Sequence, residues 1–220
     1  MDGPFGAGWT MDGLDWATIT EDAVSVGTGD GNRLWFKKEG DDYIAQAGDP
    51  FNMSLVENLD GSFTLTDKNG NESNFDEDGL LTSRVDLNGR ETTYAYIDAD
   101  SDSAVDDIDT ITDPAGREIS FGYTGGLVTS VTDFAGRVTT LDYDGSDRLD
   151  TITLEDPDDG GPLSAPETTL TYNGSGQIAS LATPEGQTTS FTYGDHGDLA
   201  SSTASSITTD YCALSQNLVR

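Results

Sequence analysis

The sequence has few of the side chains on which most catalytic and nucleic-acid-binding sites depend. It contains one histidine, one cysteine and 10 Lys or Arg against 41 Asp or Glu, so its formal net charge is −31. A chain this acidic repels phosphate, which argues against nucleic acid or an anionic membrane as its partner. No apolar run approaches the ~20 residues of a spanning helix, and residues 1–30 lack the apolar core of a signal peptide. The lone Cys212 allows no internal disulfide, so it says nothing decisive about the cellular compartment.

One phrase recurs from residue 66 onwards. It consists of an acidic or polar lead-in, a Gly, an aromatic residue or Leu five positions after that Gly, and usually a Tyr two positions later. The complete phrases are Gly70 with Phe75, Gly89 with Tyr94 and Tyr96, Gly116 with Phe121 and Tyr123, Gly136 with Leu141 and Tyr143, and Gly186 with Phe191 and Tyr193. A sixth unit lacks its lead-in and shows only Leu170 and Tyr172. The chain is therefore a repeat protein with a period of about 20 residues and some insertions.

Each unit predicts a β-hairpin. Alternation such as Thr140-Leu141-Asp142-Tyr143 puts the Leu and the Tyr on one face of a strand. The Asp-x-x-Gly segment supplies the turn, because Asp caps its own backbone and Gly accepts a positive φ. A single hairpin is only marginally stable in water, so the hairpins must stack, and accumulated strand twist must curve the stack. We therefore expect an all-β fold, a long curved antiparallel β-strip with the rings on its inner, shared face.

The repeats resemble a known family. Asp113-Pro-Ala-Gly-Arg117 with Phe121-Gly-Tyr123, and Asp133-Phe-Ala-Gly-Arg137 with Leu141-Asp-Tyr143, resemble the YD repeat of the RHS (rearrangement hot spot) protein family. The opening Gly3-Pro-Phe-Gly-Ala-Gly-Trp9 resembles the segment that precedes the repeats in that family. The resemblance covers nearly all of residues 3–205, and the order and number of the motifs make it specific.

The resemblance implies a structural role. RHS-repeat chains form β-strips that spiral into a hollow shell around a C-terminal toxin or other cargo, in secreted or surface-displayed bacterial proteins, and teneurins carry a related shell. The implied partners are the remainder of a longer RHS-type chain and its enclosed cargo, and the implied location is extracellular or at the cell surface. The self-cleaving core of the toxin-bearing members, rich in Asp-Pro-x-Gly, is not recognised after residue 205, and residues 211–220 match no motif of the family.

Three regions are expected along the chain. Residues 1–65 contain all three Trp and form the cap that hides the first edge of the strip, residues 66–205 are the repeats, and residues 206–220 are an irregular tail. Strands in the cap are predicted over 18–26, 33–37, 43–47, 53–59 and 62–66. About 17 strands at ~4.8 Å each give a strip of only ~80 Å, which is too narrow for a closed shell. We therefore interpret the chain as the N-terminal part of a shell.

An acidic insertion after Tyr96 is the candidate metal site. When Asp98 is counted as position 1 of a calcium loop, carboxylates fall at positions 1, 3, 5, 9 and 12, which are Asp98, Asp100, Asp102, Asp106 and Asp109. Calcium takes six to eight oxygen ligands, and this alternation can point successive carboxylates inward. Ser103 replaces the usual Gly at position 6, and Asp109 replaces the usual bidentate Glu. The alternative is a solvated acidic hairpin loop, and the fold itself requires no cofactor.

Two other charged features are interpreted as structural. Arg90, Arg117 and Arg137 recur directly after the turn glycine, and we expect them to pair with Asp side chains of neighbouring units across the strip. The acidic segment 155–162 is rich in turn residues and predicts a protruding loop.

Catalysis finds little support in the sequence. His196 lies in a turn after Tyr193, no Gly-x-Ser-x-Gly elbow is present, and Cys212 lacks the neighbours of a cysteine protease. The leading hypothesis is a non-catalytic structural or interaction module, part of an RHS-type β-shell that encloses or displays a cargo. The alternative is a secreted carbohydrate-binding or cell-surface adhesion domain, with surface glycans as partners. Exposed rings on the outer face favour that alternative, and inward-pointing Tyr and Phe count against it. A glycosidase, which needs two carboxylates ~5–9.5 Å apart, ranks last.

Overall fold

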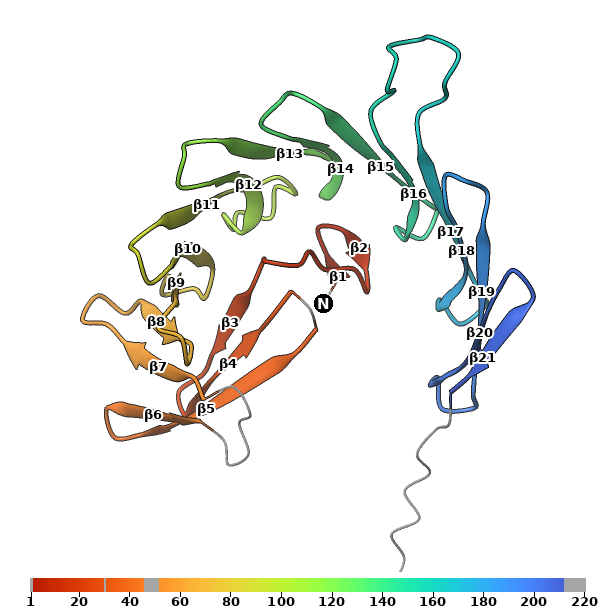
Figure 1. Cartoon of the computed structure of the whole chain (residues 1–220). Helices are drawn as coiled ribbons and strands as arrows, with labels where there is room; N and C mark the ends of the chain where they lie inside the picture. The colour runs from red at the N-terminus through yellow and green to blue at the C-terminus, as the bar shows by residue number, and fades with distance from the viewer. Residues whose placement is uncertain (1, 30, 46–51, 212–220) are drawn as a thin grey trace, which may run out of the picture. The chain divides into compact units, whose positions relative to one another are not determined.

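The computed structural model describes residues 2–29, 31–45 and 52–211, and these residues form an all-β structure (Figure 1). The described strands that pair do so in antiparallel fashion with neighbours along the chain, which confirms the predicted strip of stacked hairpins. None of the described residues belongs to a helix that could cross a membrane. The chain divides into two compact units, residues 1–137 and 138–220, and the boundary falls inside the predicted repeats.

The strands are short, as the hairpin repeat requires. The first unit contains β1 (Asp2–Gly3), β2 (Gly6–Ala7), β3 (Trp16–Ile19), β4 (Ala23–Gly27), β5 (Arg33–Glu39), β6 (Asp42–Ala45), β7 (Ser54–Glu57), β8 (Phe63–Thr66), β9 (Glu72–Phe75), β10 (Leu81–Val85), β11 (Glu91–Ile97), β12 (Asp107–Thr112), β13 (Glu118–Thr124) and β14 (Leu127–Thr132). The second unit contains β15 (Val138–Tyr143), β16 (Leu149–Thr153), β17 (Glu167–Tyr172), β18 (Ile178–Ala182), β19 (Thr188–Tyr193), β20 (Leu199–Ala204) and β21 (Ile207–Asp210).

The repeated Tyr ties each hairpin to the one before it. The Tyr stands at a β-bulge and donates its hydroxyl hydrogen to a backbone carbonyl at the start of the second strand of the preceding hairpin. The bonds are Tyr96 to Leu81 (2.9 Å) and Tyr123 to Ile108 (2.7 Å) in the first unit, and Tyr172 to Leu149 (2.6 Å) and Tyr193 to Ile178 (2.8 Å) in the second. Each bond links two hairpins and satisfies the hydroxyl of a half-buried Tyr, so the Tyr position of the repeat fixes the stacking register.

The start of the strip curls until β3 reaches the turn between β9 and β10. The Ala17 amide donates to the Gly79 carbonyl at 2.8 Å, and Trp16 forms an isolated β-bridge with Leu80. Asp15, which is buried, forms an ion pair with Arg84 of β10. These contacts join residues more than 60 positions apart, so they close the curl formed by β3 to β10.

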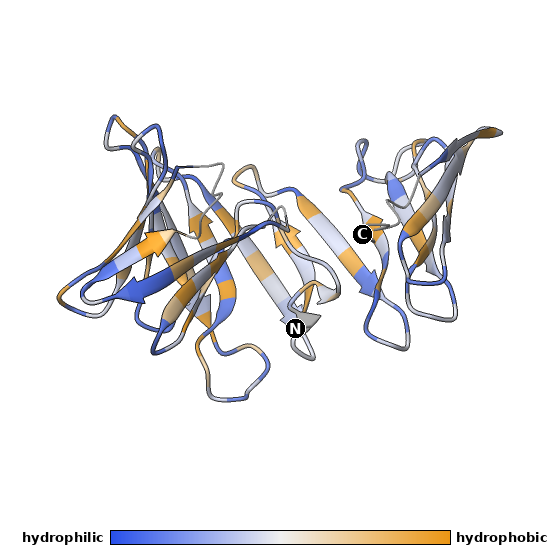
Figure 2. Ribbon diagram, turned by 90° about the horizontal axis from the view of Figure 1, so that it is seen from below, coloured by the Kyte–Doolittle hydropathy of each residue, from blue (hydrophilic) through white to orange (hydrophobic). Residues whose placement is uncertain are grey.

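The hydrophobic core of the first unit lies inside this curl. Its buried members alternate along the strands, as period-two patterning requires, and Figure 2 shows hydrophobic residues along the strands and hydrophilic ones in many of the turns. The cluster comprises Ala17, Val24, Val26, Leu34, Phe36, Tyr43, Leu55, Phe63, Leu65, Phe75 and Leu81. Further along the unit, Phe5 packs edge-on against Phe121 with ring centroids 6.2 Å apart, so the N-terminal segment covers part of that face.

The strand predictions for the cap need one correction. Residues 18–26 do not form one strand, because a tight turn at 20–23 divides them between β3 and β4. The Thr20 hydroxyl donates to the Ala23 carbonyl at 2.8 Å and accepts from the Ala23 amide at 3.1 Å, which closes the turn locally. The other cap strands are found near their predicted positions, although residues 46–47 lie outside the described residues. In the predicted tail, Ile207–Asp210 forms β21 and pairs with β20, whereas residues 212–220 lie outside the described residues.

Candidate metal loop and turn groove

The acidic insertion forms the connection between β11 and β12. Asp98, Asp100 and Asp102 are all exposed, and each contributes a carboxylate oxygen to a group in which these oxygens lie within 4.8 Å of one another. The backbone of Ser103 has φ of 80°, the left-handed conformation that a glycine at position 6 would supply, and its amide donates to Asp98 at 3.2 Å. Three of the five predicted ligands are therefore brought together.

The remaining two predicted ligands are placed differently. Asp109 lies within β12 and does not belong to the cluster of three. Asp106 lies just before β12, where partial burial, followed by the charges of Asp102, Asp107 and Asp100, raises its pKa. Like charges around a carboxyl favour its neutral form, and a bound cation would remove that effect. Calcium binding by this loop stays a prediction.

The structure adds one residue to the loop that the spacing argument did not select. Asp107 is buried and accepts hydrogen bonds from the amides of Ala99 (2.9 Å) and Asp100 (3.3 Å). It therefore shapes the loop from inside. Strand alternation would place Asp107 on the face opposite Ile108, so no local pattern in the sequence marked it as buried.

The turns of the repeat carry a second recurring arrangement of charge. In each, the Asp accepts two backbone amides on one carboxylate oxygen and binds the Arg four residues later through Nε and Nη2 on the other. The pairs are Asp86–Arg90, Asp113–Arg117, Asp133–Arg137 and Asp144–Arg148, with Nε to oxygen distances of 2.6, 2.6, 2.7 and 2.8 Å. The prediction that these Arg residues pair across the strip was wrong, because the fork of the guanidinium reaches the carboxylate of its own turn first.

These hydrogen bonds change the titration of the turn carboxyls. The Arg90 amide, and then its guanidinium, lower the pKa of Asp86 to about 2. The Arg117 and Arg137 side chains likewise lower the pKa of Asp113 and Asp133. The turns are therefore held in their charged, hydrogen-bonded state at neutral pH.

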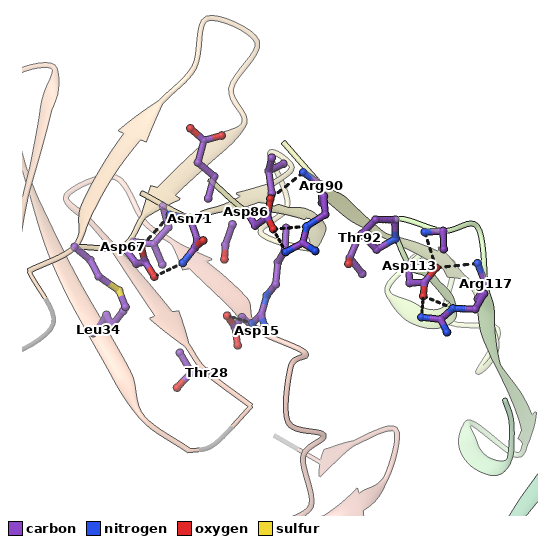
Figure 3. A pocket seen from close by; sticks show the side chains of 18 residues that line it. Asp15, Thr28, Leu34, Asp67, Asn71, Asp86, Arg90, Thr92, Asp113 and Arg117 are labelled. Atoms are coloured by element: carbon purple, nitrogen blue, oxygen red, sulfur yellow. Dashed lines mark hydrogen bonds and ion pairs between the residues drawn. The ribbon is translucent and has the colours of Figure 1, made fainter. Parts of the chain in front are cut away.

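Three successive turns line one wall of a groove in the first unit, with a volume of about 810 Å³. Figure 3 shows the pairs Asp86–Arg90 and Asp113–Arg117 beside one another, with Asp67 and Asn71 on the preceding turn and Asp15 near the centre. The lining includes five carboxylates and three guanidinium groups, so its charge is net negative: Asp15, Asp67, Glu72, Asp86, Asp113, Arg84, Arg90 and Arg117. Most of these carboxylates are already bound by a guanidinium or by hydrogen bonds within their own turn. This is the pattern of a structural row of ion pairs rather than of an acid–base centre.

The other candidate residues lie apart from these features. His196 is exposed in the turn between β19 and β20, and Cys212 lies outside the described residues. Asp156 accepts the amides of Asp158 (3.1 Å) and Gly160 (2.9 Å), so the acidic loop at 155–162 is organised by its own backbone.

The orientation of the rings bears on the carbohydrate alternative. Phe63, Phe75 and Phe121 are buried, and the repeated Tyr hydroxyls bind backbone carbonyls. Inward rings in the repeats count against a sugar-binding surface made by the repeats. Among the described residues, the strongly exposed rings are Trp35, Phe134 and Tyr211, and Phe134 is stacked against the guanidinium of Arg117.

Comparison with known proteins gives structural neighbours only. No family model matches the sequence, and no curated protein matches it. The chain is similar to a chain in the crystal structure of TcdB2-TccC3-Cdc42 (TM-score 0.43, 17% identity, covering 83% of this chain and 9% of that one). It is also similar to a chain of TcdB2-TccC3 without its hypervariable C-terminal region (TM-score 0.32, 12% identity, covering 87% of this chain and 13% of that one). A porin-like protein from Bacteroides uniformis ATCC 8492 is similar with a TM-score of 0.32 and 16% identity. The match covers 90% of this chain and 91% of that one.

These likenesses do not identify a family. The identities are below 20% and the TM-scores are below 0.5. The chain spans only about a tenth of the toxin-complex chains it matches. The function is therefore argued from the residues of this chain.

Proposed function

We propose that this chain is a non-catalytic structural and interaction module, a segment of an RHS-type β-shell that encloses or displays a cargo. The observation that carries the proposal is the Tyr-to-carbonyl bond between successive hairpins, which recurs at the same repeat position in both units. Such a bond builds a strip of any length by adding identical units. A strip whose apolar side chains lie on one face is suited to enclosing a volume.

The charge distribution fits this role better than it fits a catalytic one. The turn carboxylates are committed to their own Arg and backbone amides. Placement outside the cell, with the remainder of a longer chain and its cargo as partners, follows from the sequence resemblance and is part of the proposal.

The enclosing role is tested by limited proteolysis of the natural full-length product that contains these 220 residues. Segments enclosed by the strip are expected to resist digestion until the strip is unfolded, and mass spectrometry of the fragments identifies them. If every segment of that product outside these 220 residues were digested as fast as in the unfolded protein, the enclosing role would be contradicted.

The non-catalytic role has a separate test. The purified chain is expected to leave peptide, glycoside and nucleic-acid substrates unchanged. Turnover that is lost on substituting a single carboxylate, with the fold retained, would contradict it.

A further inference from the structure

The first of the three turns that line the groove differs from the other two. The turns join β8 to β9, β10 to β11, and β12 to β13, and each is closed by the same two backbone hydrogen bonds. Each begins with an Asp, and the fifth residue is Asn71 after Asp67, Arg90 after Asp86, and Arg117 after Asp113. The first turn therefore carries a neutral amide at the position where the other two carry a guanidinium.

The Asp67 turn keeps the geometry of the other turns without their cation. Oδ1 of Asp67 accepts the backbone amides of Asn69 (2.7 Å) and Asn71 (2.9 Å), as the same oxygen does in the other turns. Its Oδ2, which elsewhere binds Nε and Nη2 of an Arg, accepts the side-chain amides of Asn71 (2.8 Å) and Asn69 (3.4 Å). These hydrogen bonds, first that of the Asn71 side chain, lower the pKa of Asp67. The carboxylate is therefore charged at neutral pH, and its turn does not neutralise it.

A second carboxylate without a cation follows the same turn. Glu72 is the first residue of β9, is exposed, lines the groove, and forms no ion pair within the described part of the chain. The other three carboxylates of the lining, Asp15, Asp86 and Asp113, each bind an Arg. Figure 3 shows Asp67 at the end of the row of turns opposite to Asp113. The two negative charges that lack a cation therefore belong to one end of the groove.

The groove also offers volume and apolar surface. Its volume is about 810 Å³, and Leu34 and Leu65 contribute to its lining. The methylene stems of basic side chains pack on such apolar surface while their charged ends bind carboxylates. A single divalent cation would occupy only a small part of this volume, and three arginines line the same groove. The lining therefore fits long basic side chains better than a metal ion.

We propose that this groove binds an arginine-bearing segment of a protein partner, with a guanidinium on Asp67 and a second basic side chain on Glu72. The turns of this chain are the precedent, because in four of them the corresponding carboxylate oxygen binds an Arg through Nε and Nη2. A guanidinium offers two parallel donors to a carboxylate, whereas an ammonium acts as a point charge. The two unneutralised carboxylates disfavour an anionic ligand. Such a segment would bind whether or not the strip encloses a cargo.

The site is tested by isothermal titration calorimetry with a blocked peptide that carries two arginines separated by one glycine. In ~0.15 M NaCl, which screens the attraction of exposed charges beyond ~8 Å, the peptide is expected to bind saturably to one site. The same peptide with lysines should bind about threefold or more weakly, because it lacks the guanidinium fork. The same peptide with glutamates should not bind.

Replacing Asp67 by Asn or Glu72 by Gln should each weaken binding of the arginine peptide by about fivefold or more, because each removes one charged acceptor. Asp76→Asn is the matched control for Asp67→Asn. Asp76 also begins a turn without an Arg and accepts two backbone amides, of Asp78 (3.1 Å) and Leu80 (2.8 Å), but it does not line the groove. Its substitution should leave the affinity unchanged.

Asn71→Arg is the sharpest variant, because it supplies the guanidinium from the chain itself, as Arg90 and Arg117 do in the neighbouring turns. It should fold like the unaltered chain and weaken peptide binding by about tenfold or more, since Asp67 is then neutralised. Gln187→Arg is its control: it makes the same charge change at the same position of an exposed turn in the second unit. Binding by Gln187→Arg should equal that of the unaltered chain.

Three results would overturn the proposal: no saturable binding of the arginine peptide, full binding by Asn71→Arg, or equal losses in the groove variants and their controls. The last result would assign the attraction to the net charge of −31 rather than to the groove. Equal affinity for the lysine peptide would overturn the preference for a guanidinium. Circular dichroism confirms that each variant is folded before its affinity is compared.

Discussion

At the scale of single residues, the absence of a side chain decides part of the packing. Gly27 has ordinary backbone angles, so conformational freedom does not explain its presence. Its missing Cβ is what leaves room for the Trp16 ring.

Replacing Gly27 by Ala should therefore destabilise the first unit by about 1–3 kcal/mol, because the added methyl group overpacks against the indole. The free energy of unfolding in urea measures the change. Gly145→Ala is the control, since a Cβ there meets no atom within 4 Å, and it should leave stability unchanged or slightly raised. Equal effects of the two substitutions would show that Trp16 does not rest on Gly27.

The turn carboxyls predict a dependence on pH. The pKa of Asp86 is about 2, below the ~3.9 of an unfolded chain, so its contribution to stability is fully present above pH ~4 and is lost as the pH falls through 2. The difference in melting temperature between the unaltered chain and Asp86→Ala should shrink over that window. Carboxyl ¹³C shifts measured by NMR give the midpoint directly, and a midpoint near 4 would contradict the hydrogen-bonded turn.

At the scale of elements, the hairpin is the unit and the Tyr hydroxyl is its link to the preceding hairpin. The bulge beside the Tyr directs its ring toward the preceding hairpin, where a carbonyl at the start of a strand accepts the bond. The same geometry serves hairpins with different turns, because it uses only backbone atoms of the neighbour.

Tyr193→Phe should lower the free energy of unfolding by about 0.5–1.5 kcal/mol, because it removes the 2.8 Å bond and leaves the Ile178 carbonyl without this donor. Tyr211→Phe removes only an exposed 3.2 Å contact with Ser202 and should have little effect. The rates of amide hydrogen exchange in β18 and β19 show whether the loss of stability lies at this bond. Unchanged exchange in Tyr193→Phe would show that the bond does not fix the stacking.

The loop between β11 and β12 makes a prediction of its own. If Asp98, Asp100 and Asp102 hold calcium, CaCl₂ should raise the melting temperature more than NaCl at equal ionic strength, and Asp100→Asn should abolish the excess. Asp159→Asn, in the other acidic loop, should retain it. Equal effects of the two salts would identify the loop as a solvated acidic connection.

At the scale of the whole molecule, net charge dominates. A charge of −31 on 220 residues repels itself, because 41 acidic side chains stand against only 10 basic ones. Raising NaCl from ~0.01 M to ~1 M shortens the Debye length from ~30 Å to ~3 Å and should raise the melting temperature. Differential scanning calorimetry measures the melting temperature at each salt concentration. A melting temperature that falls with salt would show that the ion pairs outweigh the repulsion.

The hairpin repeat could be predicted from the sequence because its causes are local. A Gly that permits the turn, an Asp that caps it and a ring five residues later all act within one unit, so Gly116 and Phe121 predict their strand and turn without any distant partner. Three of the five predicted metal ligands also meet for a local reason, since Asp98, Asp100 and Asp102 share one short connection.

The tertiary structure alone decided which distant residues meet. Asp15 and Arg84 are paired across 69 positions because the strip curls, and no local pattern shows how far strand twist will carry β3. The Trp16 ring rests on Gly27 because the β3–β4 register places them opposite each other, and a shift of one residue would have turned the ring toward the core. Local chemistry determined the repeating unit of this protein, whereas the accumulated twist and register of many units decided its core and its outer face.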